Sequence, residues 1–160
     1  MKYEPKKIAA LLVALGLLAA GCQAANQTPG YTTPLKVGGA KIFVKVAKSD
    51  EEKRHGLSGQ ERLKDEQGML FDFTQEAEAR PGFWMKEMKF DLDIIWIKKN
   101  PSTGSGRIIG ITANVPSPKN ADDKLPLYSP PSPVDMVLEV TAGWSERHKV
   151  KVGDEVEFVN

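Results

Sequence analysis

Cysteine and histidine, two residue types that often supply nucleophiles, bases and metal ligands, are scarce in this sequence. Its 160 residues include one cysteine, Cys22, and two histidines, His55 and His148. The histidines lie far apart and have no second ligand at helical or hairpin spacing, so we predict no metal site. After Cys22 the sequence has no cysteine nucleophile, Gly-x-Ser-x-Gly elbow or phosphate-binding glycine loop. We therefore predict no cofactor and favour a protein without catalytic activity over an enzyme.

An excess of one charge is also missing. The chain has 22 lysines and arginines and 21 aspartates and glutamates, a net charge of +1. Removing residues 1–21 would take away three lysines and one glutamate and change the net charge to −1. Neither form has a broad basic field, so we predict no nucleic-acid partner.

No apolar run is long enough to cross a membrane. The longest, from Ile8 to Ala20, has 13 residues, whereas a spanning helix needs about 20. Lys2, Lys6 and Lys7 precede this run and small residues follow it. This order is typical of a secretory signal peptide, which we expect to occupy residues 1–21.

The single cysteine comes directly after this segment. The sequence "LLAAGC" that ends at Cys22 resembles the lipobox of bacterial lipoproteins, in which that thiol carries diacylglycerol. The alternative is a thiol that is free or paired between chains. We expect lipidated Cys22 to anchor the protein on the outer face of the cytoplasmic membrane or on the periplasmic side, and the choice of membrane stays open.

The remaining chain divides into a tether and a single domain. Residues 22–34 are polar, contain prolines and lack charge, so we expect a tether of roughly 20 Å. We expect one folded domain over residues 35–160.

Apolar alternation and short apolar runs predict mainly β structure in this domain. The expected strands cover residues 41–47, 68–73, 82–86, 92–98, 107–115, 134–140 and 154–159. Ser49 and Glu52 form a capping-box pattern that predicts a short helix ending at Gly56. Residues 116–133 contain six prolines and are expected to be an irregular loop. The pattern predicts a small barrel-like or sandwich domain of six to eight short strands with one or two short helices.

Four motifs then bring out a family resemblance. They are "RHGLSGQERLKDEQGMLFDF", "FWMKEMKFDLDIIWI", "VLEVTAGW" and "VKVGDEVEF". In this order they resemble the domain of unknown function 192 (DUF192) family over residues 36–160. The resemblance implies a small, mainly β fold and a bacterial envelope setting, and it implies no activity.

Two aspartates raise the question of a catalytic pair. Asp91 and Asp93 share one face of an extended strand about 6.5 to 7 Å apart, a separation that suits paired carboxylates. The family pattern, however, matches Asp93 and has proline at the position of Asp91. Because an unpaired buried charge is costly, we expect Asp93 to pair with Lys86, with Arg54 or backbone amides as alternatives.

Aromatic residues complete the predicted site. By alternation Trp96 belongs to the core, whereas Trp84 is expected to be exposed and could stack on a ligand. The predicted ligand-binding residues are Trp84, Met85, Lys86, Asp93 and Tyr128.

Two functions remain open after these observations. The preferred one is a membrane-anchored envelope lipoprotein whose β-rich domain binds an envelope ligand or a protein partner. The alternative is a hydrolase acting on an envelope polymer, with Asp93 as acid or base and Lys86 as electrostatic stabiliser.

Overall fold

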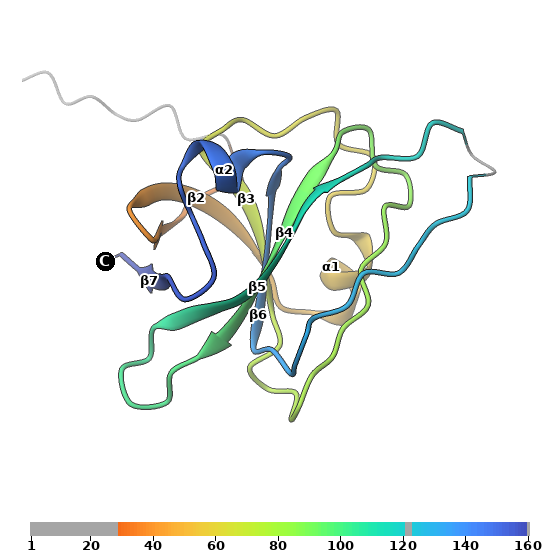
Figure 1. The fold of residues 1–160 in the computed structure, drawn as a ribbon. Helices are drawn as coiled ribbons and strands as arrows, with labels where there is room; N and C mark the ends of the chain where they lie inside the picture. Colours follow the sequence, from red (N-terminus) through yellow and green to blue (C-terminus); the bar gives the residue numbers. More distant parts are fainter. Residues whose placement is uncertain (1–28, 121–122, 160) are drawn as a thin grey trace, which may run out of the picture.

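In the part of the chain that the structure describes, seven strands close into a barrel accompanied by two short helices (Figure 1). The structure, a computed structural model, describes residues 29–120 and 123–159. In chain order the elements are β1 (Thr33–Val37), β2 (Ala40–Ala47), α1 (Asp50–His55), β3 (Gln67–Asp72), β4 (Leu92–Lys99), β5 (Gly106–Val115), β6 (Met136–Thr141), α2 (Trp144–Arg147) and β7 (Glu155–Phe158). This architecture confirms the predicted small, barrel-like, mainly β fold.

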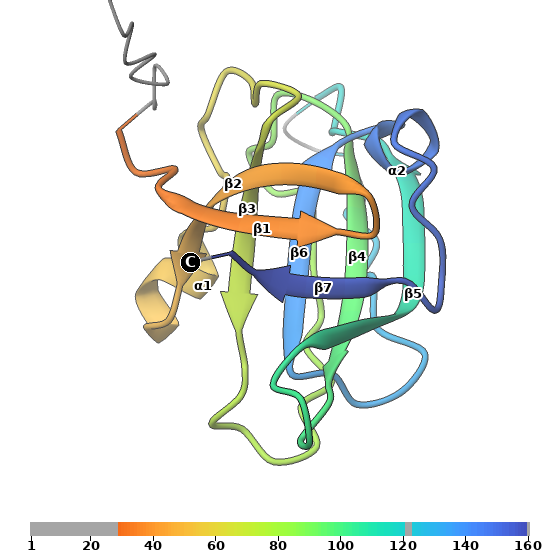
Figure 2. The ribbon, with the colours of Figure 1, turned by 90° about the vertical axis from the view of Figure 1, so that its left-hand side faces the viewer.

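The strands follow the order β1-β2-β3-β6-β4-β5-β7 around the barrel. Only the β2–β3 pair is parallel among these described neighbours, and α1 lies in its connection. Figure 2 shows β1 and β7 crossing over β3, β6 and β4, which closes the barrel. The site described below is built on the β3–β6–β4 portion of the wall.

Strands β3, β6 and β4 are mainly apolar on both faces. Leu70, Leu138 and Ile95 stand side by side across these strands and point into the barrel. Because successive side chains of a strand point to opposite faces, the neighbouring residues point to the outer face of the wall. There they form a second apolar layer, which contains Met69 and Ile94. Strand β4 is accordingly buried at every position from Leu92 to Ile97.

The outer layer is covered by α1 and by connecting segments. Figure 1 shows α1, the segment between β3 and β4 and the described parts of the segment between β5 and β6 on the same side of the β3–β6–β4 wall. Leu57 follows α1, and Phe83, Met85 and Met88 lie between β3 and β4; all four side chains are buried in this layer. The molecule therefore has one apolar core inside the barrel and another outside it.

The predicted capping box begins α1. The Ser49 hydroxyl accepts a hydrogen bond from the Glu52 backbone N–H at 3.2 Å, and the Glu52 carboxylate accepts one from the Ser49 N–H at 3.0 Å. Gly56 ends the helix with φ of 53°, a value that glycine adopts without steric cost. The helix and both of its boundary signals are confirmed.

Three local features differ from the sequence predictions. Residues 82–86 do not form a strand: Phe83 makes only an isolated bridge to Tyr128, in which each N–H donates to the other's carbonyl at 2.8 Å. Strand β1 begins at Thr33, inside the predicted tether, with Pro34 near its start, where a missing N–H is tolerated. Helix α2 was not predicted, because its four residues are too few to show a helical period.

Candidate ligand-binding site

A glutamate stands in the middle of the outer apolar layer. Glu139 lies on β6 between Met69 of β3 and Ile94 of β4. Its side chain shares the outer face with Val137, since alternate residues of a strand point the same way. Only 5% of Glu139 is exposed. The strand register therefore places an ionisable group where its neighbours are apolar.

The Glu139 carboxyl has no bonded partner in the described structure, and its oxygens are accessible to a cavity rather than sealed in the core. Among residues 29–120 and 123–159, no hydrogen-bond donor or cation is bonded to it. Burial raises the pKa of Glu139 from its ordinary value of 4.5 to about 8, because a charge is poorly solvated among apolar side chains. At neutral pH the group is therefore mainly protonated.

Glu139 lines a cavity of about 230 Å³. Aromatic and other apolar side chains form most of its wall, namely those of Leu57, Phe71, Phe73, Phe83, Trp84 and Met88. Lys53, Arg54 and His55, in the last turn of α1, also line it. A pocket with an apolar wall and a few polar groups is the usual form of a small-molecule site.

Edge-to-face packing holds the aromatic wall in place. The ring centroids of Phe71 and Phe83 lie 4.9 Å apart with their planes at 90°. Phe83 also packs on Phe73 at 6.4 Å and on Trp96 at 5.6 Å. Because the Phe83 backbone is fixed by its bridge to Tyr128, this wall is formed before any ligand enters.

The rim carries an aromatic ring and several cations. Trp84 is 53% exposed, and the Lys86 ammonium lies over its ring, 5.9 Å from the centroid. Lys53 forms an ion pair with Glu76 at 2.6 Å and lies over the Phe73 ring at 4.5 Å. Arg54 and His55 are exposed. The rim is therefore basic, whereas the floor is acidic.

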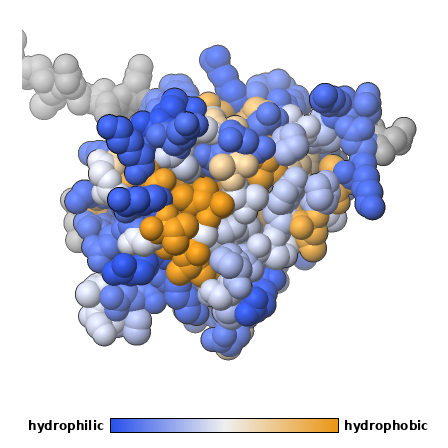
Figure 3. Space-filling view, in the orientation of Figure 1, coloured by the Kyte–Doolittle hydropathy of each residue, from blue (hydrophilic) through white to orange (hydrophobic). Residues whose placement is uncertain are grey.

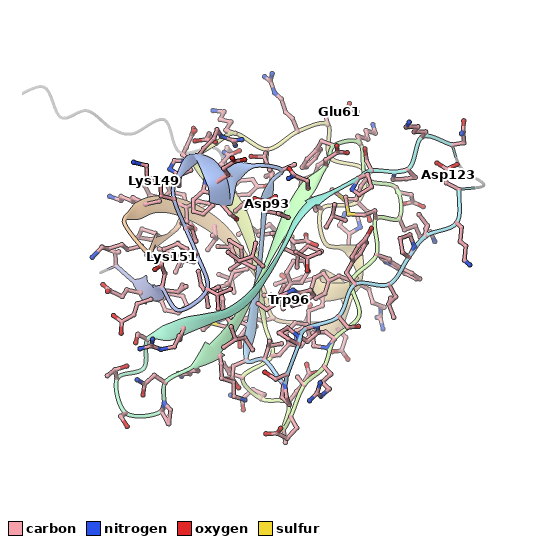
Figure 4. All side chains as sticks on the ribbon, in the orientation of Figure 1. Glu61, Asp93, Trp96, Asp123, Lys149 and Lys151 are labelled. Carbon is pink, nitrogen blue, oxygen red and sulfur yellow. The ribbon has the colours of Figure 1, made fainter. Side chains whose placement is uncertain are left out.

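Asp93 lies on the other face of the wall from this pocket. Its side chain is fully buried at the end of the barrel, near α2 (Figure 4). One carboxylate oxygen accepts the backbone N–H groups of Asn114 at 2.9 Å and Gly143 at 3.0 Å, and the other accepts that of Ser145 at 2.9 Å. Backbone amides, which were one of the alternatives, are therefore its partners.

The expected ion pair between Asp93 and Lys86 is absent from the described contacts. Lys86 lies in an exposed turn before β4, whereas Asp93 alternates with Ile94 and so points to the barrel interior. Asp91 precedes β4 and accepts the N–H and hydroxyl of Ser117 at 2.7 and 2.9 Å. The two aspartates thus belong to separate hydrogen-bond groups.

The other predicted site residues are dispersed. Trp84 lines the Glu139 cavity, and Tyr128 packs behind it, bridged to Phe83. Met85 is 2% exposed and part of the core, and Lys86 lines a separate hollow beside Met88. Cys22 lies outside the described residues. Trp96 is buried in the core as expected.

Glu139 was missed by sequence reasoning. The available signal was an acid inside the run "VLEV", between Leu138 and Val140. Period-2 alternation places such an acid on a solvated face. Only the second apolar layer, which the sequence did not predict, makes this face buried.

Other kinds of site find little support in the described residues. Over residues 29–120 and 123–159, no three His, Cys, Asp or Glu side chains gather as metal ligands would. No helix in the same part of the chain is long and apolar enough to cross a membrane.

Figure 3 shows a largely hydrophilic face with an apolar patch over β5 and the segment that leads to β7. Val152, 59% exposed, lies in that segment.

Together these features define a class: a small closed β-barrel domain with an acid-floored aromatic pocket in a layer outside the barrel. Residues 33–158 match the DUF192 family, described as "Uncharacterized ACR". The chain therefore belongs to this family, which confirms the resemblance carried by the four motifs.

Two solved structures resemble the chain over most of its length. A proposed transcription regulator from Sinorhizobium meliloti 1021 is 27% identical, with 79% of this chain and 91% of that chain covered and a TM-score of 0.64. A protein of unknown function from Novosphingobium aromaticivorans DSM 12444 is 28% identical, with 78% and 84% covered and a TM-score of 0.64. The search of curated proteins gave no match.

Proposed function

We propose that this protein is a membrane-anchored lipoprotein of the bacterial envelope whose barrel domain binds a small envelope ligand in the Glu139 pocket. One observation carries the binding function: Glu139 is 5% exposed, lines an aromatic cavity and has no bonded partner among the described residues. A carboxyl without a bonded partner in an apolar layer costs free energy, and an apolar residue between Met69 and Ile94 would avoid this cost. Binding of a ligand to the carboxyl would explain why an acidic residue occupies this position, whereas folding alone does not explain it.

The anchoring function is supported by the sequence. Three lysines, a 13-residue apolar run and Cys22 follow one another as in a lipoprotein precursor. Acylation of Cys22 would hold the barrel at a membrane surface, because several acyl chains together anchor firmly. The pocket would then be presented to molecules of the envelope.

The hydrolase alternative has less support. Asp93 is 0% exposed and accepts three backbone N–H groups, so its oxygens are already engaged within the protein. A general acid or base must come within hydrogen-bond reach of its substrate. Lys86, the second residue of that hypothesis, lies in a different part of the molecule. Binding is therefore the better supported function.

Native mass spectrometry can test the binding function. The full-length chain, in a non-ionic detergent, would be incubated with a fractionated envelope extract and compared with Glu139→Leu. Leucine removes the carboxyl but keeps a similar volume and an apolar character, so the fold should be retained. We expect a small-molecule adduct on the wild type that is lost on Glu139→Leu.

A matched pair of surface variants provides the control. Trp84, 53% exposed, lines the pocket, whereas Phe158, 49% exposed, lies on β7 outside it. We expect Trp84→Ala to weaken the adduct and Phe158→Ala to leave it unchanged. This pair also keeps the test decisive if Glu139→Leu folds poorly. Absence of any wild-type adduct, or an equal adduct on all folded variants, would show that the pocket is not a binding site.

A further inference from the structure

The pocket combines one acidic group with several aromatic faces. Glu139 supplies the acid, and Phe71, Phe73, Phe83 and Trp84 supply the rings. Lys53 and Lys86 already lie over one face of Phe73 and of Trp84, at 4.5 and 5.9 Å from the ring centroids, so a ligand would use the remaining faces. The face of an aromatic ring is electronegative and attracts cations, most strongly when the cation is shielded from water. A carboxylate in the same enclosure attracts a cation as well. Once Glu139 is ionised, the wall and the floor therefore both favour a positively charged ligand.

The hydrogen-bond capacity of the wall restricts the kind of cation. A primary ammonium carries three N–H donors, and each needs an acceptor when it is buried. Among the described residues, Glu139 is the only acidic side chain that lines the cavity. The Ser58 hydroxyl donates to the Lys86 carbonyl at 2.9 Å and can still accept one N–H, but most of the remaining wall is apolar. A quaternary ammonium has no N–H group and can rest against rings and a carboxylate without leaving a donor unpaired.

The cations at the rim indicate what lies next to the ammonium group. Lys53 is paired with Glu76 at 2.6 Å, whereas Arg54 and His55 have no ion-pair partner among the described residues. These two residues would repel a ligand with only positive charge. They would attract an anionic group held just outside the pocket, and the Arg guanidinium suits phosphate or carboxylate.

We infer that the pocket binds the quaternary ammonium end of a zwitterion, with the anionic end at Arg54 and His55. This inference rests on the proposed binding function and names its ligand class. The cavity of about 230 Å³ is smaller than the usual site of a drug-sized molecule, and its size suits a headgroup of the phosphocholine type. Such a group is available as a free molecule or on a lipid.

Binding of the ammonium end requires Glu139 to lose its proton. The side chains that face it from β3 and β4, including Met69, Phe71 and Ile94, are apolar. The charged or titratable groups that share its cavity are Lys53, Arg54 and His55 of α1. Since burial raises the pKa of Glu139 to about 8, affinity should increase about tenfold per pH unit below that value and then level off.

Isothermal titration calorimetry with three probes tests this inference on the full-length chain in non-ionic detergent. Phosphocholine carries both charges, choline carries only the ammonium group, and 3,3-dimethylbutyl phosphate replaces the ammonium with an uncharged group of the same shape. We expect phosphocholine to bind at least about tenfold more tightly than 3,3-dimethylbutyl phosphate, the equivalent of one lost buried charge contact.

Variants at the two ends separate the two charge contacts. Glu139→Gln should weaken phosphocholine and choline about tenfold and leave 3,3-dimethylbutyl phosphate unchanged. Arg54→Gln should weaken phosphocholine and leave choline unchanged or slightly tighter. Between pH 6 and 8 choline affinity should rise in the wild type more than in Glu139→Gln. Because Glu139→Gln keeps His55, any effect of His55 is the same in both proteins. The difference between their pH profiles therefore reports on Glu139.

The outcomes distinguish this inference from the proposed function. If the wild type binds 3,3-dimethylbutyl phosphate as tightly as phosphocholine, or binds none of the probes, the quaternary ammonium class is wrong. An extract adduct that depends on Glu139 would in that case still support a ligand-binding pocket. Competition for phosphocholine by phosphatidylcholine vesicles, but not by phosphatidylglycerol vesicles, would identify a lipid headgroup as the source. Tight binding of free phosphocholine without such competition would identify a soluble molecule.

Discussion

At the scale of a single residue, Glu139 stands out because the surrounding fold opposes its charge. Its partners on β3 and β4, Met69 and Ile94, are apolar and buried. The folded protein consequently holds the carboxyl in its protonated form more strongly than the unfolded chain does, with a pKa of about 8 in place of 4.5. This difference links stability to pH.

The first prediction is that Glu139→Gln removes a stability loss that the wild type shows at high pH. Below pH 4.5 the carboxyl is protonated in both the folded and the unfolded state. As pH rises from 4.5 to 8 the unfolded chain releases this proton first, so the wild type loses up to about 5 kcal/mol. Glutamine stays neutral throughout. We therefore expect the variant to match the wild type near pH 4 and to be more stable near pH 9.

Urea unfolding of both proteins across this pH range provides the measurement. The lowered pKa values of Asp65 and Asp72 add a stability that is lost as pH falls. Both proteins share this contribution, so it cancels in the difference between them. A difference that stays constant with pH would show that Glu139 is solvated in the folded state.

Asp93 shows the opposite situation, because it is a buried acid whose two carboxylate oxygens both accept hydrogen bonds. Three backbone N–H groups from β5 and the start of α2 donate to it at 2.9 to 3.0 Å. The second prediction is that Asp93→Ala destabilises the protein by about 3 kcal/mol, because the donors lose their acceptor inside the fold. Denaturant unfolding gives this value. Normal stability combined with lost ligand binding would instead assign Asp93 to the binding site.

At the scale of secondary structure, the capping box fixes the start of α1, the helix that carries Arg54 and His55 to the pocket. Ser49 and Glu52 satisfy each other's backbone N–H groups at 3.2 and 3.0 Å. The third prediction is that Ser49→Ala lowers the free energy of unfolding by about 1 kcal/mol through loss of this cap. Thermal or denaturant unfolding measures the change.

Ser102→Ala is the matched control for the cap. Ser102 is an exposed serine in the turn after β4, and its backbone N–H, which alanine keeps, donates to Asn100 at 2.9 Å. Its replacement should alter stability by less than about 0.5 kcal/mol. Equal effects of the two substitutions would mean that the cap does not stabilise α1.

Signals that lie within one element were readable from the sequence. The alternation in residues 41–47, the apolar run of 92–98 and the capping box each depend on neighbours in the chain, and β2, β4 and α1 form as expected. Residues 82–86 also have strand-like composition, but Phe83 packs against Phe71 and Trp96, and among the described residues it pairs only through an isolated bridge to Tyr128. Tertiary packing therefore determines the conformation of residues 82–86, rather than their local composition.

The candidate site depended on contacts that the sequence does not display. Trp84 could be placed at the surface by alternation, but the burial of Glu139 follows from a second layer supplied by segments far away in the chain. The pairing of Asp93 with Lys86 failed for the same reason. Adjacent residues of β4 point to opposite layers, and the partners in each layer come from other elements.

At the scale of the whole molecule, the two apolar cores separate folding from binding. In the described part of the chain, seven strands enclose the barrel interior. The apolar residues that line the pocket belong to the outer layer, on the side where α1 and the connecting segments lie (Figure 1). Trp84 and Arg54 are exposed and lie outside the strands, so changes there should alter the rim and leave the strand pairing intact. We therefore expect pocket variants to remain folded, which makes their binding data interpretable.

The fourth prediction concerns the attachment of this molecule to a membrane. If Cys22 is acylated, Cys22→Ser should move the protein from the membrane fraction to the soluble fraction, because the lipid chains supply the anchoring free energy. Detergent phase partitioning and intact-mass measurement of both proteins check this. The wild type should carry the mass of a diacylglycerol group that the variant lacks, while both barrels melt at the same temperature. A Cys22→Ser protein that still sediments with membranes and retains residues 1–21 would show that the apolar run itself is the anchor.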